Sequence, residues 1–259
     1  MNLKFSKYHG CGNDFVMIDN RDGVFGDITT PKIQRICDRH TGIGADGIIL
    51  LENTDEALFR MRYFNALEGD ETMCGNGARS VVAFARDLGL VGDEEIKFLA
   101  HDGIHKAEIL ENGEVSVSMS DFETPTSHNK GFVCNTGCPH YVETFFDTDN
   151  FDLIPYARSI RYSTDFPTGI NVNIVESDSE IKMRTYERGV EEETLACGTG
   201  AVAVAGTLAS DLNAGEEKEF VIKARGGELK VKLTRTKNGF ENVWLTGPAT
   251  KAFEGELPC

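Results

Sequence analysis

Two of the seven cysteines stand in the same local sequence, and that sequence suits acid–base chemistry on a bound anion. Cys74 begins the run Cys-Gly-Asn-Gly-Ala, and Cys197 begins the run Cys-Gly-Thr-Gly-Ala. Each Gly-x-Gly turn precedes a segment that is predicted to be helical, so each cysteine should stand at a helix start. Backbone N–H groups at a helix start bind carboxylate or phosphate, and the same field lowers the pKa of a thiol.

A matched pair of such thiols predicts inversion of an amino-acid α-carbon. One base removes the α-proton from one face, and a conjugate acid returns a proton to the other face. A carboxylate held at helix starts is stabilised while negative charge develops on it. A lone cysteine before Gly-Asn-Gly is more often structural than catalytic, but two copies at matching positions favour Cys74 and Cys197 as a catalytic pair.

The two cysteine segments belong to an internal duplication. Residues 61–65 (Met-Arg-Tyr-Phe-Asn) lead to the first cysteine, and residues 183–187 (Met-Arg-Thr-Tyr-Glu) lead to the second. The tripeptide Thr-Gly-Ile precedes each copy. A repeat of this kind predicts two pseudo-symmetric lobes, residues 1–122 and 123–259, with the C-terminal end of the chain packing back on the first lobe.

Each copy has the pattern strand, loop, helix. Residues 59–63 alternate between apolar residues and arginine, which is the period of a strand. The segment 201–212 after the second cysteine is apolar on every face, so that helix must be enclosed. Further alternating segments lie at residues 114–119, 181–186 and 228–233. The pattern predicts an α+β fold in which strands wrap around a central helix in each lobe, with the active site in the cleft between the lobes.

Composition limits the partners and the compartment. A formal charge of −16 and a pI near 4.8 argue against nucleic acid and anionic membranes, which require a basic surface. No apolar stretch approaches the ~18 residues of a membrane-spanning helix, and no signal-type run opens the sequence. Scattered cysteines in an odd number are typical of a reducing compartment, so we expect a cytoplasmic protein.

Three other kinds of site fit the sequence less well. Neither glycine turn continues into the Gly-Lys-Ser/Thr of a phosphate loop, and neither has the third glycine of a dinucleotide fingerprint. The residues that could serve zinc are His9, Cys11, Cys134, Cys138 and His140, but their spacing forms no zinc knuckle. The sequence leaves pyridoxal phosphate open, although no clustered lysine suggests it. We predict no metal and no cofactor.

Several separate motifs resemble those of the diaminopimelate epimerase family, and the resemblance runs nearly from end to end. The motifs lie at residues 9–15, 42–47, 64–65, 73–79, 139–140, 171, 186–189 and 196–201. The resemblance implies a cofactor-independent isomerase that interconverts LL- and meso-diaminopimelate with Cys74 and Cys197, in lysine and peptidoglycan biosynthesis. It also implies an amino-acid substrate as the binding partner and a homodimeric assembly.

The resemblance further implies roles for the other site residues. The backbone that would hold the α-carboxylate belongs to Gly75, Asn76, Gly198 and Thr199. The side chains that would line the pocket are Asn13, Asn65, Asn171, Glu187 and Arg188. His140 and Glu187 would lie beside the thiols and tune their pKa, and Arg188 would pair with the distal carboxylate through its two-point fork. Without the resemblance, the asparagines could equally be turn residues and Glu187–Arg188 a solvated pair.

This chain departs from the family pattern at three places. Cys138 stands where an asparagine is expected near the distal end of the substrate, Cys11 stands where a small apolar residue is usual, and the segment from Glu187 to Cys197 is one residue longer. The first departure leaves open a related racemase of another amino acid, such as histidine. A binding protein that uses the same cleft without turnover is the alternative from another class. Arg188 favours a substrate with a distal carboxylate.

Overall fold

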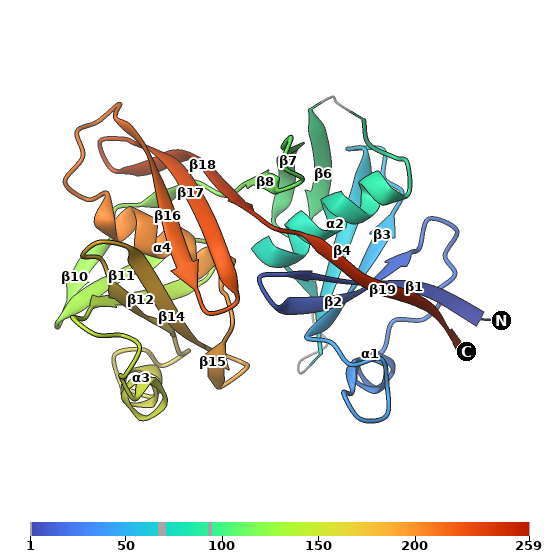
Figure 1. The fold of residues 1–259 in the computed structure, drawn as a ribbon, viewed down its shortest axis with the longest axis horizontal. Helices are drawn as coiled ribbons and strands as arrows, with labels where there is room; N and C mark the ends of the chain where they lie inside the picture. Colours follow the sequence, from blue (N-terminus) through green and yellow to red (C-terminus); the bar gives the residue numbers. More distant parts are fainter. Residues whose placement is uncertain (1, 67–70, 93–94, 259) are drawn as a thin grey trace. The chain divides into compact units, whose positions relative to one another are not determined.

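The computed structural model describes residues 2–66, 71–92 and 95–258, and the chain divides into two compact units (Figure 1). Unit 1 comprises Met1–Val117 and Gly247–Cys259, and unit 2 comprises Ser118–Thr246. Residues 118–122, which fall in the first half of the predicted division, belong to unit 2. There the amide of Met119 donates to the carbonyl of Val243, and the ring of Phe122 lies 5.1 Å from that of Phe240.

Unit 1 is a strongly curved sheet. Its strands are β1 (Asn2–Gly10), β2 (Asn13–Asp19), β3 (Gly47–Glu52), β4 (Phe59–Asn65), β5 (Glu71–Thr72), β6 (Ile96–Ala100), β7 (Gly103–Ile109), β8 (Val115–Ser118) and β19 (Thr250–Pro258). In hydrogen-bonding order they run β19-β1-β2-β3-β4-β6-β7-β8, and β5 pairs with the end of β4. The β2–β3 and β4–β6 pairings are parallel, and the others are antiparallel.

Unit 2 repeats this order. Its strands are β9 (Phe122–Glu123), β10 (Thr126–His128), β11 (Gly131–Asn135), β12 (Pro139–Thr144), β13 (Asn171–Glu176), β14 (Ile181–Glu187), β15 (Glu192–Thr194), β16 (Glu217–Ala224), β17 (Gly227–Arg235) and β18 (Gly239–Gly247). They run β10-β11-β12-β13-β14-β16-β17-β18-β9, with β15 on the end of β14. The parallel pairings, β12–β13 and β14–β16, fall at the same places as in unit 1. The duplicated α+β architecture predicted from the sequence is confirmed.

Helices join the parallel strands, because such strands need a crossover connection. Helix α1 (Thr30–Cys37) lies between β2 and β3, and α3 (Leu153–Arg161) lies between β12 and β13. The sequence analysis did not predict these two short helices. Helix α2 (Gly75–Asp87) leads from β5 to β6, and α4 (Gly198–Leu208) leads from β15 to β16.

The helices α2 and α4 are the central elements of their units (Figure 1). Helix α2 is buried from Gly75 to Ala85 and contacts β1, β2, β3, β4, β7 and β19. Helix α4 contacts β11, β12, β13, β14 and β17, and its apolar residues are buried on every face, as predicted. It ends at Leu208 rather than at residue 212, and just beyond that end the hydroxyl of Ser210 donates to the carbonyls of Gly206 and Thr207.

Strand alternation places one helix on each side of the sheet. In β3, Ile48 and Leu50 pack with Ile33 of α1, whereas Ile49 lies against the start of α2. This double burial explains why β3 is apolar at successive positions. In unit 2, Val172 and Ile174 of β13 pack in the same way with the residues of α3.

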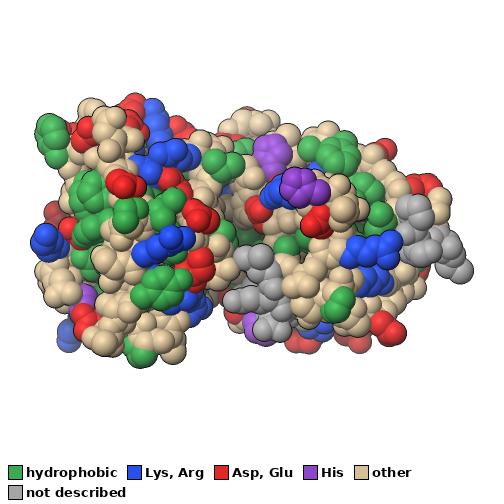
Figure 2. Space-filling view, turned by 90° about the horizontal axis from the view of Figure 1, so that it is seen from below, with side chains coloured by type: hydrophobic (Ala, Val, Ile, Leu, Met, Phe, Trp, Pro, Cys, Tyr) green, Lys and Arg blue, Asp and Glu red, His purple; other side chains and the backbone are tan. Residues whose placement is uncertain are grey.

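The surface carries charges of both signs. On the face drawn in Figure 2, acidic and basic side chains are interspersed rather than gathered by sign. Within the described ranges, no helix has both the length and the apolar character needed to cross a membrane.

Candidate active site

Cys74 and Cys197 occupy the same structural position in the two units. Each is the N-cap of a central helix, with extended backbone angles (φ −137°, ψ 117° and φ −120°, ψ 115°). The carbonyls of Cys74 and Cys197 accept the first helical hydrogen bonds, from Ala78 and Ala201. Because the first turn of a helix has no preceding helical carbonyls to bond, backbone N–H groups at each helix start can bind an anion beside the thiol.

The second glycine of each turn lets the helix start lie against a strand. A Cβ added to Gly77 would lie 2.8 Å from the Cδ1 of Ile49, and one added to Gly200 would lie 2.6 Å from the Oδ1 of Asn173. Both distances are shorter than a real contact, so no larger residue fits either position without a shift of its neighbour. These glycines set the distance between the thiol-bearing helix end and the strands β3 and β13.

The thiol of unit 1 lies beside a pair of amide side chains. The Sγ of partly exposed Cys74 is 3.6 Å from the Oδ1 of Asn13, and the Nδ2 of Asn76 donates to the same oxygen at 3.1 Å. The Nδ2 of Asn13 donates to the carboxylate of Asp46 at 2.6 Å. Asn65 ends β4 opposite Gly47, next to Asp46, so the predicted residues of unit 1 are brought together.

Charged residues hold this corner of unit 1. Asp46 lies 2.6 Å from Arg39, which is also 2.8 Å from Asp14, and Asp14 is 2.8 Å from Lys7. The cations lower the pKa of Asp14 to about 2, although its burial acts in the opposite direction. The cluster fixes Asp46, and through Asp46 the amide of Asn13.

The thiol of unit 2 lies in a different setting. Cys197 is 5 % exposed, and its Sγ lies 3.5 Å from the hydroxyl of Thr199. That hydroxyl is 3.0 Å from the Nε2 of His140 and 3.3 Å from the thiol of Cys138. The Cys138 thiol and Nε2 of His140 are themselves 3.2 Å apart. His140, Cys138 and Cys197 thus share Thr199 as a common neighbour.

The hydrogen bonds around Asn173 fix the tautomer of His140. The Nδ2 of Asn173 donates to the carbonyl of Tyr141 at 3.0 Å and lies 3.1 Å from the Nδ1 of His140, while its Oδ1 accepts from Thr185. Since a carbonyl only accepts, the amide faces Nδ1 with a donor, and the ring hydrogen is on Nε2. Complete burial lowers the pKa of His140 to about 3, with a smaller effect of Arg188. His140 is therefore a neutral donor toward Thr199 and Cys138.

The pKa of the Cys197 thiol differs from the value that the sequence predicted. A helix start was predicted to lower the pKa of each thiol, but burial raises the pKa of Cys197 well above its usual range. The carboxylate of Glu187 and the thiol of Cys138 raise the pKa further, against the opposing hydrogen bonds from Thr199 and Gly200. Removing this sulfur from water destabilises the thiolate more than the two hydrogen bonds stabilise it, so the protonated thiol is favoured.

The remaining predicted residues surround Cys138 and Glu187. Asn171 accepts a hydrogen bond from the amide of Arg188 at 2.8 Å and donates to the sulfur of Cys138 at 3.2 Å. The exposed guanidinium of Arg188 donates to the carbonyl of Thr168 at 3.2 Å, and the described residues contain no ion-pair partner for it. Glu187 accepts from the hydroxyl of Thr194.

Four residues that sequence reasoning missed complete the two settings: Arg79, Thr136, Asn173 and Thr185. Thr136 donates to the carbonyl of Thr199 at 2.9 Å, and Asn173 and Thr185 orient His140. Asn173 carried a signal, because it is a polar residue inside the apolar strand Val172–Val175. Arg79 carried no comparable signal, because only the structure shows that this arginine is buried in α2.

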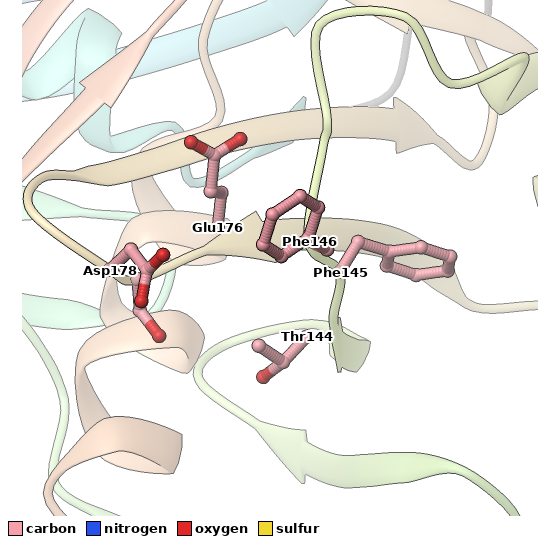
Figure 3. A pocket seen from close by; sticks show the side chains of 6 residues that line it. Thr144, Phe145, Phe146, Glu176 and Asp178 are labelled. Carbon is pink, nitrogen blue, oxygen red and sulfur yellow. The ribbon is translucent and has the colours of Figure 1, made fainter.

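A concave pocket of about 280 Å³ lies elsewhere in unit 2 (Figure 3). Thr144, Phe145, Phe146, Glu176, Ser177 and Asp178 line it, and none of them is a predicted site residue. Two carboxylates in the lining disfavour an anionic ligand. In the described part of the chain, no group of three or more His, Cys, Asp or Glu side chains is arranged to hold a metal ion.

Comparison with known proteins agrees with the duplicated fold. The sequence profile of the family described as diaminopimelate epimerase matches residues 5–124 and 132–252, once for each half. A diaminopimelate epimerase of Flavobacterium psychrophilum is 43 % identical over 255 residues, covering 97 % of this chain and 99 % of that protein. One of Aquifex aeolicus is 40 % identical over 277 residues and covers 98 % of each chain.

Solved structures share the fold at low sequence identity. A Bacillus anthracis phenazine biosynthesis protein of the PhzF family superposes with a TM-score of 0.75 at 18 % identity, over 100 % of both chains. A hydroxyproline epimerase of Agrobacterium vitis gives 0.68 at 13 %, over 99 % of this chain and 91 % of its own. The end-to-end matches to curated relatives identify the chain as a member of the diaminopimelate epimerase family.

Proposed function

We propose that this chain is a diaminopimelate epimerase that inverts one α-carbon with the thiols of Cys74 and Cys197. The observation that carries the proposal is the repetition of one thiol at the start of a buried helix in each unit of a duplicated fold. A binding protein needs no second acid–base group at the equivalent position. The names of relatives that match the whole chain supply the substrate.

The proposed reaction exchanges one proton on each face of the α-carbon. The thiolate of one cysteine takes the α-proton and becomes a thiol, and the carbon keeps the electron pair of the broken C–H bond. The thiol of the other cysteine donates a proton to the opposite face and becomes a thiolate. The substrate α-carboxylate, bound by backbone N–H groups of both helix starts, stabilises the carbanion as charge spreads onto its oxygens. The proposal requires that both helix starts reach one substrate.

The two thiols begin the cycle in different forms under this proposal. The raised pKa of Cys197 makes it the proton donor of the resting protein, and the hydrogen bond from Thr199 then stabilises the thiolate that forms. Neutral His140 supports this step, because its Nε2–H donates to Thr199 and leaves the Thr199 hydroxyl proton for sulfur. Cys74 is then the base that starts the reaction.

Arg188 is the proposed partner of the distal carboxylate. Its exposed guanidinium binds only one carbonyl among the described contacts, so its remaining N–H donors are free for a ligand. Such an activity would supply meso-diaminopimelate to lysine and peptidoglycan synthesis, in a cytoplasmic and cofactor-free enzyme.

Proton NMR of LL-diaminopimelate in D₂O tests the proposal with the purified protein alone. We expect loss of the α-proton signal together with appearance of the meso isomer, without added metal or pyridoxal phosphate. Exchange of the α-proton of histidine, without exchange in diaminopimelate, would show a racemase with a different substrate. Binding without any exchange would leave only a binding protein and overturn the proposal.

A further inference from the structure

The guanidinium of Arg79 is buried beneath the thiol site of unit 1. The side chain is 0 % exposed, and it donates from Nη2 to the Oδ1 of Asn76 at 2.8 Å and from Nη1 to the carbonyl of Gly75 at 3.3 Å. The turn between β1 and β2 closes over it, since a Cβ on Gly10 would lie 3.1 Å from Nη2 and the thiol of Cys11 interacts with the guanidinium. The described residues give its Nε no hydrogen-bond partner.

This cation has no carboxylate in ion-pair contact among the described residues. Complete burial lowers the pKa of Arg79, and the acidic groups that act against this are the thiols of Cys11 and Cys74, which are charged only when deprotonated, and the carboxylate of Glu114. Cys11 is 1 % exposed, and burial raises its pKa, so it remains a thiol at neutral pH. Of these two thiols, only Cys74 becomes a thiolate in the proposed reaction, so its negative charge would develop near Arg79.

The second unit shows that the fold does not require this charge. Val202 follows Cys197 by five residues, as Arg79 follows Cys74, and it is 0 % exposed in α4. The same central helix is thus built with an apolar side chain at the matched position. A buried cation in one copy only indicates a role specific to the first thiol.

Arg79 also fixes the polarity of the amides beside Cys74. A guanidinium can only donate, so it holds the Oδ1 of Asn76 and turns the Nδ2 of Asn76 toward the Oδ1 of Asn13, 3.1 Å away. At the other end of this series of hydrogen bonds, the carboxylate of Asp46 can only accept, so it receives a hydrogen bond from the Nδ2 of Asn13. Both amides are locked, and a carbonyl oxygen faces the sulfur of Cys74 at 3.6 Å.

We propose that Arg79 is a positioning residue for Cys74, which locks the Asn76–Asn13 amide pair and supplies a permanent positive charge that favours the Cys74 thiolate. The inference rests on the proposed function and deepens it. The acceptor oxygen of Asn13 by itself favours the protonated thiol, whereas the charge of Arg79 favours the thiolate. In unit 2 the nearby charge is the carboxylate of Glu187, which acts in the opposite direction on Cys197.

The test is the pH dependence of alkylation by iodoacetamide, followed for each cysteine by peptide mass spectrometry on the substrate-free protein. In the wild type, Cys74 should reach its half-maximal rate at a lower pH than Cys197. Arg79→Met should slow alkylation of Cys74 about tenfold at pH 7, which corresponds to a pKa higher by about one unit. The profile of Cys197 should stay in place. Arg79→Lys should leave the pH dependence of Cys74 alkylation unchanged, because the positive charge remains. It should raise KM for diaminopimelate, because the guanidinium hydrogen bond to Asn76 is lost.

Arg86→Met is the matched control, since it removes an exposed guanidinium from the same helix and should leave both profiles unchanged. An unshifted Cys74 profile in folded Arg79→Met would overturn the inference. If that variant does not fold, the wild type decides, because Cys74 titrating at or above Cys197 would also overturn it. Alkylation needs no turnover, so a shifted Cys74 profile in a protein that epimerises nothing would overturn only the proposed function.

Discussion

The two thiol sites share a backbone and differ in almost every surrounding side chain. Both cysteines are N-caps with extended backbone angles, and both precede buried helices. Cys74 is partly exposed, lies against an amide and has a buried cation below it. Cys197 is buried, and its neighbours are a neutral histidine, a second thiol and a carboxylate.

The difference shows which parts of the duplicated site are free to diverge. The helix start and its glycines are present in both copies, as expected if both bind the carboxylate of the proposed substrate through the backbone. The side chains around the sulfur set its protonation state, and a two-base reaction needs one thiolate and one thiol at the same time. Divergent surroundings on a repeated backbone provide that difference.

The strongest test of the comparison removes one thiol at a time. Cys74→Ala and Cys197→Ala should each lower epimerisation by roughly 10²–10⁴-fold or more, because either direction of the reaction needs both an acid and a base. Turnover is measured by NMR with LL- and meso-diaminopimelate. Cys37→Ala is the control and should retain activity, since Cys37 is the last residue of α1 and is buried in the core. Full turnover in either site variant would refute the two-thiol mechanism.

Variants of Arg188 and Cys138 test which of these two residues of unit 2 recognises the distal group of the substrate. Charge-assisted hydrogen bonds from Arg188 should contribute about 1.5–3 kcal/mol, so Arg188→Met should lower kcat/KM for diaminopimelate by roughly ten- to hundredfold. Cys138→Asn should change it little, because an amide can keep the contacts with Asn171 and His140. The reverse order of effects would assign recognition of the distal group to position 138.

The neutral histidine of unit 2 makes stability depend on pH. His140 has a pKa of about 3 when folded and its ordinary value of 6.5 when unfolded, so between these pH values the unfolded chain binds the extra proton. The free energy of unfolding therefore falls as pH falls through 6.5. At pH 5 this loss is about 2 kcal/mol relative to pH 8.

Urea unfolding of His140→Gln measures this contribution. The decrease in unfolding free energy from pH 8 to pH 5 should be smaller by about 2 kcal/mol than in the wild type. His40→Gln, which changes an exposed histidine, should leave the wild-type decrease unchanged. Equal decreases in His140→Gln and the wild type would show that His140 is not held neutral by burial.

The fold was predictable from the sequence where an apolar pattern extended over many residues or where a motif occurred twice. The strand at 59–65, the enclosed second helix and the duplication were readable because alternation and matched motifs leave few other arrangements. Helices α1 and α3 were missed, since each has only eight or nine residues, which is too short for an apolar pattern at helical spacing to repeat more than about twice. The C-terminal end was expected to pack back on the first lobe, and β19 pairs there with β1, but no local pattern encodes the partner strand or its register.

The candidate site was predictable as a set of residues but not as an electrostatic environment. Motifs identified Cys74, Cys197, His140 and Glu187, and the structure places the last two near Cys197. The expectation of a lowered pKa at Cys197 was wrong, because burial depends on side chains that arrive from β12, β13 and β14. Local sequence shows the helix start, whereas desolvation is a property of the packed unit.

The smallest expected effect is on the free energy of unfolding when the matched glycines Gly77 and Gly200 are each replaced by alanine, which adds one methyl group. In a helix, Gly→Ala gains about 1 kcal/mol of propensity, which overpacking of typically 1–3 kcal/mol opposes. At Gly77 the new Cβ meets the flexible ends of Ile49 and Met61, which can move aside, so Gly77→Ala should be close to neutral. At Gly200 it meets the Oδ1 of Asn173, an amide held on both sides by Thr185 and Tyr141.

Gly200→Ala should therefore lower the unfolding free energy by about 1 kcal/mol. It should also lower kcat several-fold, because a displaced Asn173 releases the ring of His140 that supports Thr199. Thermal or urea unfolding, together with initial rates, compares the pair under identical conditions. If Gly77→Ala cost as much as Gly200→Ala, packing alone would account for both glycines. The difference between the two units would then lie in the charges near each sulfur and not in the amide that orients His140.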